Sequence, residues 1–303
     1  MWARTGGPAP NPAARLASLL RLLLLPLVGG CATVPLERAG SLSSYQHLAP
    51  SDGLLTQAQV SVSKDEILAA KTIRVIPTSF PTSLSVAAAE AKLSEAQLRL
   101  IANAVDRSLC TGLSDRFAIV AGAQPADLTV RAFITRIIPT DEIAAAASKA
   151  TSVAASVASA VGAVTAPVPS LRFPIGLGGL ALEAEAVDGS GTQKAAMLWA
   201  RGADPVTSKP RVSAAGDAYE LASSFGDDFS KLLVTGASPF KTLPSPPSMN
   251  RVGSLFGGAP KESACETFGR GPGVPGLLGS AIGAPPEWTD KGAQAEAEAP
   301  AMR

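Results

Sequence analysis

The sequence predicts an α+β fold: a mixed, mostly antiparallel sheet of about five strands, two main helices on one face, and an additional alanine-rich helical segment. Three observations lead to this prediction. Several runs are β-branched or alternate with period two, two longer segments repeat apolar residues at helical spacing, and their order is strand, helix, four strands, helix. A doubly wound nucleotide-binding fold would need strands and helices in strict alternation, so this order excludes it.

The first strand and the first helix follow from local signals. Residues 72–77 are rich in β-branched side chains and end at Pro77, which cannot donate a hydrogen bond to a neighbouring strand. Ser94 and Gln97 have the spacing of a capping box, and Gly112 is available to end the helix that they begin. The apolar residues of this helix share one face: Leu98, Ile101, Val105 and Leu109.

Two further strands are predicted at residues 117–121, a short apolar run, and residues 127–135, where apolar and polar residues alternate. We expect these two strands to pair through a turn at residues 122–126.

A hairpin and a second helix complete the predicted domain. Residues 180–187 and 193–201 flank a turn of small residues, as in a hairpin. Residues 214–235 repeat large apolar side chains at helical spacing, and Gly236 marks the end of this helix.

The alanine-rich segment, residues 143–164, holds ten alanines and one charge, Lys149. Its small residues at spacings of four would let another helix approach closely, which allows a helix that enters a membrane or forms a homo-oligomer. We favour a surface helix of high intrinsic propensity, because Ala and Ser gain little from leaving water.

Residues 1–30 have the pattern of a secretion signal. Three arginines precede the apolar run of residues 22–28, which is too short to span a bilayer. Residues 28–31 resemble a lipobox, after which Cys31 would carry diacylglycerol and palmitate-type acyl chains. The mature protein is therefore expected to begin at Cys31.

The regions on either side of the folded domain are predicted to lack structure of their own. In residues 31–57 the apolar residues show only weak periodicity, which predicts a lipidated N-terminus and a flexible tether. Residues 58–236 form the predicted α+β domain. In residues 237–303, Pro and Gly supply 20 of 67 residues, a composition typical of disorder.

Two cysteines remain if Cys31 is lipidated. Cys110 and Cys265 could form a disulfide in an oxidising periplasm, or remain one buried thiol and one idle thiol in the tail. Both alternatives are compatible with the sequence.

Composition and side-chain chemistry exclude several function classes. Without residues 1–30 the chain has 23 basic and 25 acidic residues, so its near-neutral charge argues against nucleic-acid binding.

His47 is the only histidine, which rules out a Ser-His-Asp set or a histidine-based metal cluster elsewhere, and we expect no metal or cofactor. Glu183 and Glu185 share one strand face; we interpret this as a solvated face paired with Lys194 and Arg201, although paired carboxylates also suit acid/base chemistry.

Residues 41–45, 126–130 and 182–188, with the turn that follows, together resemble the bacterial lipoprotein family called domain of unknown function 3313, over about residues 31–235. The resemblance implies an outer-envelope lipoprotein of unestablished activity. Ala32 and Thr33 lack the aspartate that favours inner-membrane retention, so we expect the periplasmic side of the outer membrane.

The predicted function is that of a noncatalytic periplasmic module, an accessory or scaffold for an envelope assembly, with envelope proteins as partners and the membrane reached through the lipid. The alternative is a small-ligand binder or weak hydrolase that uses Glu183 and Glu185.

Overall fold

A mixed β-sheet organises the computed structural model, which describes residues 34–81, 93–122, 124–160, 172–241, 246–290 and 292–293. Within these residues the sheet has seven strands in the order β1-β2-β7-β6-β5-β3-β4. The predicted secretion signal and Cys31 lie outside the described residues, and so does part of the alanine-rich segment.

The strands differ in direction and length. Strand β3 runs parallel to both of its neighbours, β4 and β5, and the other neighbouring strands pair antiparallel. Their bounds are β1 Ala49–Pro50, β2 Thr56–Val62, β3 Thr72–Val75, β4 Ala118–Ile119, β5 Leu128–Ile138, β6 Gly179–Asp188 and β7 Gln193–Gly202. The α+β class is confirmed, whereas the expected number of about five strands is wrong. Strand β1 lies in the predicted tether, and β2 spans the boundary between that tether and the predicted domain, where we expected no strand.

The predicted pairing of residues 117–121 with 127–135 is also wrong, because β3 lies between β4 and β5. Asp127 explains this arrangement. Its carboxylate accepts hydrogen bonds from the backbone N–H groups of Lys71 and Thr72 at 2.8 and 2.9 Å, which fastens the start of β5 beside the start of β3. These two bonds connect residues more than fifty positions apart, which no local turn signal reveals.

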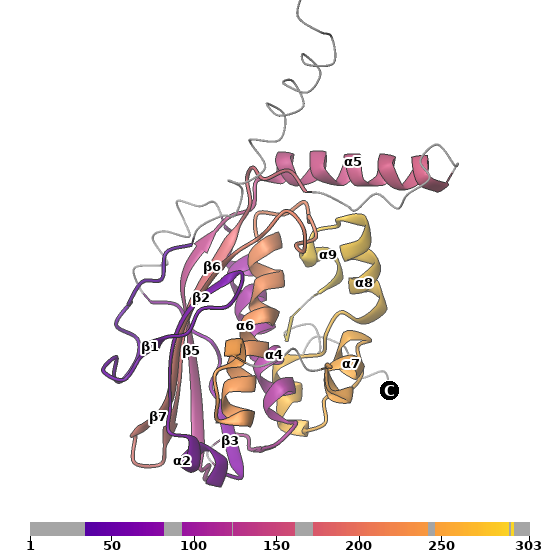
Figure 1. Cartoon of the computed structure of the whole chain (residues 1–303). Helices are drawn as coiled ribbons and strands as arrows, with labels where there is room; N and C mark the ends of the chain where they lie inside the picture. Colours follow the sequence, from indigo (N-terminus) through magenta and orange to yellow (C-terminus); the bar gives the residue numbers. More distant parts are fainter. Residues whose placement is uncertain are drawn as a thin grey trace, which may run out of the picture. The chain divides into compact units, whose positions relative to one another are not determined.

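Helices α4 (Glu95–Leu113) and α6 (Gly216–Thr235) lie side by side on one face of the sheet (Figure 1). The predicted capping box is present, since Ser94 Oγ accepts from Gln97 N–H and Gln97 Oε1 accepts from Ser94 N–H. Helix α6 ends at Gly236, whose φ of 64° places it in the left-handed region that favours glycine.

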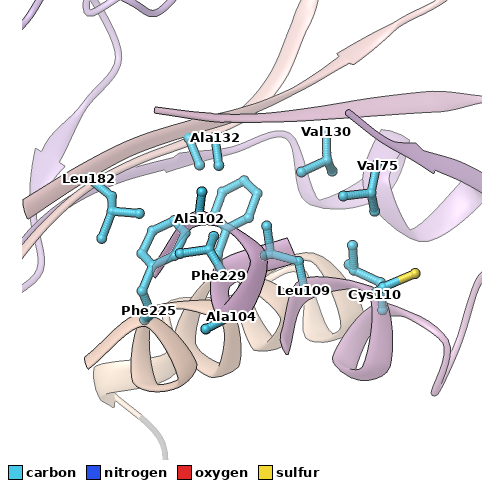
Figure 2. Packing of buried hydrophobic residues seen from close by; sticks show 14 of the residues in the cluster. Val75, Ala102, Ala104, Leu109, Cys110, Val130, Ala132, Leu182, Phe225 and Phe229 are labelled. Atoms are coloured by element: carbon cyan, nitrogen blue, oxygen red, sulfur yellow. The ribbon is translucent and has the colours of Figure 1, made fainter. Parts of the chain in front are cut away.

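The main core lies between this helix pair and the sheet. Figure 2 shows Leu109 of α4 and Phe225 and Phe229 of α6 directed towards Val130 and Leu182 of the strands. Trp199 of β7 meets Phe225 edge to face, with ring centroids 5.7 Å apart. The indole N–H of Trp199 donates to Asp228 at 2.9 Å, so the largest core side chain leaves no unsatisfied polar atom.

Two further helices connect strands of the sheet. Helix α2 (Lys64–Ala69) connects β2 to β3, and α5 (Glu142–Ala160) follows β5 within the alanine-rich segment. No helix among the described residues is both long and apolar enough to cross a membrane.

The described residues of the C-terminal region form helices and turns, although the composition of residues 237–303 predicted a disordered tail. These elements are α7 (Met249–Leu255), α8 (Gly273–Ile282), α9 (Pro286–Thr289) and the 3-10 turns η2 (Pro239–Lys241) and η3 (Ser263–Phe268). A disulfide joins Cys265 of η3 to Cys110 of α4. Most large apolar side chains of its described residues are exposed, so the region gains order by docking on α4 and α6, which composition alone cannot show.

A buried polar cluster completes this docking. The Asp290 carboxylate is ion-paired with Arg107 of α4 and accepts the Tyr219 hydroxyl of α6 at 2.7 Å. Both Arg107 and Asp290 are buried, so the attraction between their charges must offset the cost of removing each charge from water.

Candidate functional site

The face of the sheet opposite α4 and α6 carries the candidate site. Residues 34–48, which we call the N-terminal strap, lie across this face instead of forming a flexible tether. On β6, Leu182 and Ala184 face the helices, so alternation along the strand turns Glu183 and Glu185 towards the strap. Both glutamates are fully buried.

Glu183 binds the middle of the strap through both carboxylate oxygens. Oε1 accepts the backbone N–H of Ala39 at 2.7 Å. Oε2 accepts the backbone N–H of Ser41 at 3.1 Å and the hydroxyl of Tyr45 at 2.7 Å. One carboxylate therefore satisfies three donors from seven consecutive residues of the strap.

Glu185 holds the next part of the strap and also joins two strands. Its Oε2 accepts the backbone N–H of Ser43 at 2.9 Å and the side-chain amide of Gln193 at 2.7 Å. Its Oε1 accepts the Ser43 hydroxyl at 3.1 Å and is ion-paired with Arg131 of β5. Gln193 also donates to the carbonyl of Ser44 at 3.1 Å.

The interpretation of Glu183 and Glu185 as a solvated face is therefore wrong. Neither Lys194 nor Arg201 is their partner: Lys194 pairs with Glu66 and Asp188, and Arg201 pairs with Asp204. Alternation correctly predicts that both glutamates share a face, but a distant segment covers that face. The buried carboxylates need hydrogen-bond donors, and the strap supplies them.

Apolar contacts support the polar ones. Val34 packs on Ala181 and Ala200, and Leu42 packs on Ala196 and Leu198. Small side chains on β6 and β7 leave room for this close approach. At Gly179 the fit is closest, because an added Cβ would lie 2.3 Å from Val34 Cγ2. The start of the strap is thus packed where β6 begins.

Tyr45 is the polar side chain at the centre of the strap. Partial burial is the main reason that its pKa is raised, and the hydrogen bond to Glu183 raises it further. The hydroxyl therefore remains protonated and donates to the carboxylate. Arg38 lies over the Tyr45 ring, 5.6 Å from its centroid, which adds a cation–π contact. His47 is exposed near the end of the strap.

The site acts as a set of structural acceptors. All four oxygens of Glu183 and Glu185 receive hydrogen bonds from the protein, so these carboxylates are occupied in holding the strap. Sequence reasoning identified the two glutamates but missed Ser41, Ser43 and Tyr45 as their partners. The available signal was that residues 41–45 and 182–188 carry the family resemblance together; the structure brings these two motifs into contact.

A second polar feature lies on the other side of the sheet. A cavity of about 420 Å³ is lined by Thr78, Phe80, Leu100 and Asp106 together with residues of α9 and the segment that follows it. Asp106 Oδ1 accepts the backbone N–H and the hydroxyl of Thr78 at 2.9 and 2.6 Å. Burial raises the pKa of the Asp106 carboxyl to about 7. Among the described residues, no group of three or more His, Cys, Asp or Glu side chains is placed to hold a metal ion.

Comparison with known proteins adds a family and two distant structures. The family model for "Protein of unknown function (DUF3313)" matches residues 37–229. The PelC dodecamer from Paraburkholderia phytofirmans in space group P6 is similar over 60% of this chain and 98% of that chain, with 8% identity and a TM-score of 0.31. A point variant of that dodecamer in space group C2 covers 57% of this chain and 95% of its own, with 10% identity and a TM-score of 0.30. No curated protein matches the chain. Because both TM-scores are low, neither structure indicates the function of this chain.

Proposed function

The chain belongs to the DUF3313 family of proteins of unknown function, and from this premise we propose that it is a lipoprotein held by acylated Cys31 on the periplasmic side of the outer membrane. In this proposal its noncatalytic domain serves as an accessory or scaffold of an envelope assembly.

The attachment of the strap to β6 carries the proposal. Val34 is buried against the sheet and lies only three residues after Cys31. Fully extended, three residues span about 11 Å at most. The domain would therefore be held close to the membrane, in a restricted range of orientations, whereas a flexible tether would let it diffuse away.

The geometry favours a structural role over the alternative role as a ligand binder or weak hydrolase based on Glu183 and Glu185. A general acid or base needs an oxygen that can reach a substrate. Here the donors of the strap and of neighbouring strands occupy all four oxygens, and removing those donors would leave two buried carboxylates without partners.

Acylation is tested by expressing the full chain in a bacterium supplied with labelled palmitate. We expect mass spectrometry of the mature protein to find diacylglycerol on residue 31, and we expect the matched Cys31→Ser variant to remain unlabelled. An unlabelled wild-type chain would refute the anchor. Density-gradient separation of the envelope tests the location, because recovery in the inner membrane contradicts it.

The scaffold role needs a separate test. Cross-linking in cells, followed by identification of the attached proteins, should recover the same envelope proteins in independent preparations of wild type. Cys31→Ser should lose them, since it is no longer held at the membrane. Failure to recover any reproducible partner from acylated wild-type protein would contradict the scaffold role while leaving the anchor intact.

A further inference from the structure

One end of the sheet combines several chain segments that are distant in sequence. We call it the strap end: β6 begins there at Gly179, opposite the end of β7 at Gly202 and the end of β5 at Ile138. Strand β2 starts at the same end, because Thr56 pairs with Arg201. The first described residue of the strap, Val34, packs on Gly179 at this end.

The connections at the strap end expose large apolar side chains. They come from the β1–β2 turn, the start of α5, the segment before β6 and the segment after β7. Their exposed fractions run from 45% for Phe173 to 98% for Leu54. The five residues are Leu54, Ile143, Phe173, Ile175 and Val206.

Backbone hydrogen bonds hold three of these segments together. Arg172 N–H donates to the Pro205 carbonyl at 3.0 Å, which joins the segment of Phe173 to that of Val206. Asp141 N–H donates to the Gly176 carbonyl at 2.9 Å, which joins the start of α5 to the same segment. The apolar side chains are therefore presented by connected backbone.

A buried ion pair fixes these segments to the core. The Arg172 guanidinium binds the Asp217 carboxylate of α6 with two hydrogen bonds, one of them 2.8 Å long. Asp217 Oδ2 also accepts the backbone N–H of Gly178 at 2.7 Å. A buried polar network thus holds the chain at Arg172 and Gly178, on either side of Phe173 and Ile175.

The opposite end of the sheet has a different character. It carries α2 and the β6–β7 turn, where Lys64, Asp65 and Glu66 are exposed and Lys194 pairs with both Glu66 and Asp188. The strap end therefore has an apolar surface beside the beginning of the strap, whereas charged side chains cover the opposite end.

We propose that the strap end rests on a lipid bilayer, with Leu54, Ile143, Phe173, Ile175 and Val206 inserted in its interfacial region. This inference rests on the proposed function, since acylated Cys31 would lie within three residues of Val34 and would bring this end to the bilayer. A few exposed apolar side chains bind a bilayer only weakly by themselves. An acyl chain beside them keeps the protein at the membrane, so that their insertion becomes an intramolecular step. Phe173 is suited to this depth because Phe, like Trp and Leu, is typical of the apolar surfaces that peripheral proteins bury at the boundary of headgroups and acyl chains.

Tryptophan quenching by brominated lipid tests the orientation. The mature chain lacks Trp2, and the exposed Trp288 is first replaced (Trp288→Phe), which leaves the buried Trp199 as background. Phe173→Trp then places a reporter at the strap end, and Leu68→Trp on α2, where Leu68 is 37% exposed, places a matched reporter at the opposite end. Each acylated full-length protein is reconstituted in phosphatidylcholine vesicles with brominated acyl chains.

We expect at least twofold quenching at position 173 and none above background at position 68. In the Phe173→Trp protein, Ile175→Asp with Val206→Asp should reduce the quenching at least twofold. Equal quenching at both positions, or none at 173 in protein shown to be acylated, would overturn this inference and leave the proposed anchor standing.

A second arm removes the dependence on acylation. The Cys31→Ser chain, produced without residues 1–30 and therefore without Trp2, is held on the same vesicles through a C-terminal histidine tag and nickel-chelating lipid. Quenching at 173 that exceeds quenching at 68 supports an intrinsic preference of the strap end for lipid, even where mass spectrometry finds no acyl chain on wild type. Where wild type proves not to be acylated, absence of this difference in the second arm refutes the inference.

Discussion

The hydroxyl of Tyr45 donates a hydrogen bond to the carboxylate of Glu183 at 2.7 Å, across 138 positions of sequence. The same carboxylate binds the backbone at Ala39 and Ser41. A single buried side chain thereby connects the segment after the predicted lipid anchor to the centre of the sheet.

Replacing Glu183 should release the strap. We expect Glu183→Ala to lower the free energy of unfolding by roughly 2–4 kcal/mol, because three buried donors lose their acceptor. Tyr45→Phe removes only one of these bonds and should cost about 1 kcal/mol. Urea unfolding measures both values, and amide hydrogen exchange at Ala39 and Ser41 should accelerate in Glu183→Ala. Unchanged exchange at both amides would show that Glu183 does not hold the strap.

The disulfide between Cys110 and Cys265 is tested by thiol titration. The native mature protein should show no reactive thiol from this pair until reductant is added, and two free thiols would contradict the bond. The double replacement Cys110→Ser with Cys265→Ser should lower the free energy of unfolding by roughly 4–5 kcal/mol, from the chain entropy that closing so long a loop removes. The oxidised and reduced wild type provide the matched comparison.

Docking of the C-terminal region should depend on Asp290. Asp290→Ala leaves the buried Arg107 charge and the Tyr219 hydroxyl without their acceptor, so we expect a loss of roughly 3–5 kcal/mol. Limited proteolysis should then cleave within residues 246–290 faster than in wild type. Glu266→Ala removes a carboxylate from the exposed pair with Arg270 and serves as the control, with an expected change below about 0.5 kcal/mol. Equal cleavage rates in both variants would contradict the docking role of Asp290.

Asp106 should make stability depend on pH. Its pKa is about 7 in the folded protein and near 3.8 in the unfolded chain, because burial disfavours the charged form. Between these values the folded state binds the extra proton, so the free energy of unfolding falls as pH rises from about 4 to 7. The loss approaches roughly 4 kcal/mol for a shift of this size.

The variant Asp106→Asn isolates this effect, since an amide cannot ionise but can still accept from Thr78. Its free energy of unfolding should depend less on pH than that of wild type between pH 4 and 7. Denaturant unfolding at several pH values provides the measurement. Parallel curves for the two proteins would mean that Asp106 does not titrate in this range.

Local sequence signals predicted the elements whose cause is local. The capping box at Ser94 marked the start of α4, and Gly236 marked the end of α6. Alternation of apolar and polar residues located β5, β6 and β7 to within a few residues. Strand β2 was missed although Ala58, Val60 and Val62 alternate there with polar residues. Local signals also placed β4 beside β5, since nothing local reveals the bonds from Asp127 to the start of β3.

The sequence by itself determined the α+β class, the family and the shared face of Glu183 and Glu185, because periodicity, caps and motif order are properties of neighbouring residues. Only the tertiary structure decided that this face is covered, that residues 34–48 are bound to it, and that the described C-terminal residues pack on α4 and α6. The physical reason is that burial of a charge or a proline-rich segment depends on partners far away in the chain. Tyr45 and Glu183, or Cys110 and Cys265, acquire their roles only when folding brings them together.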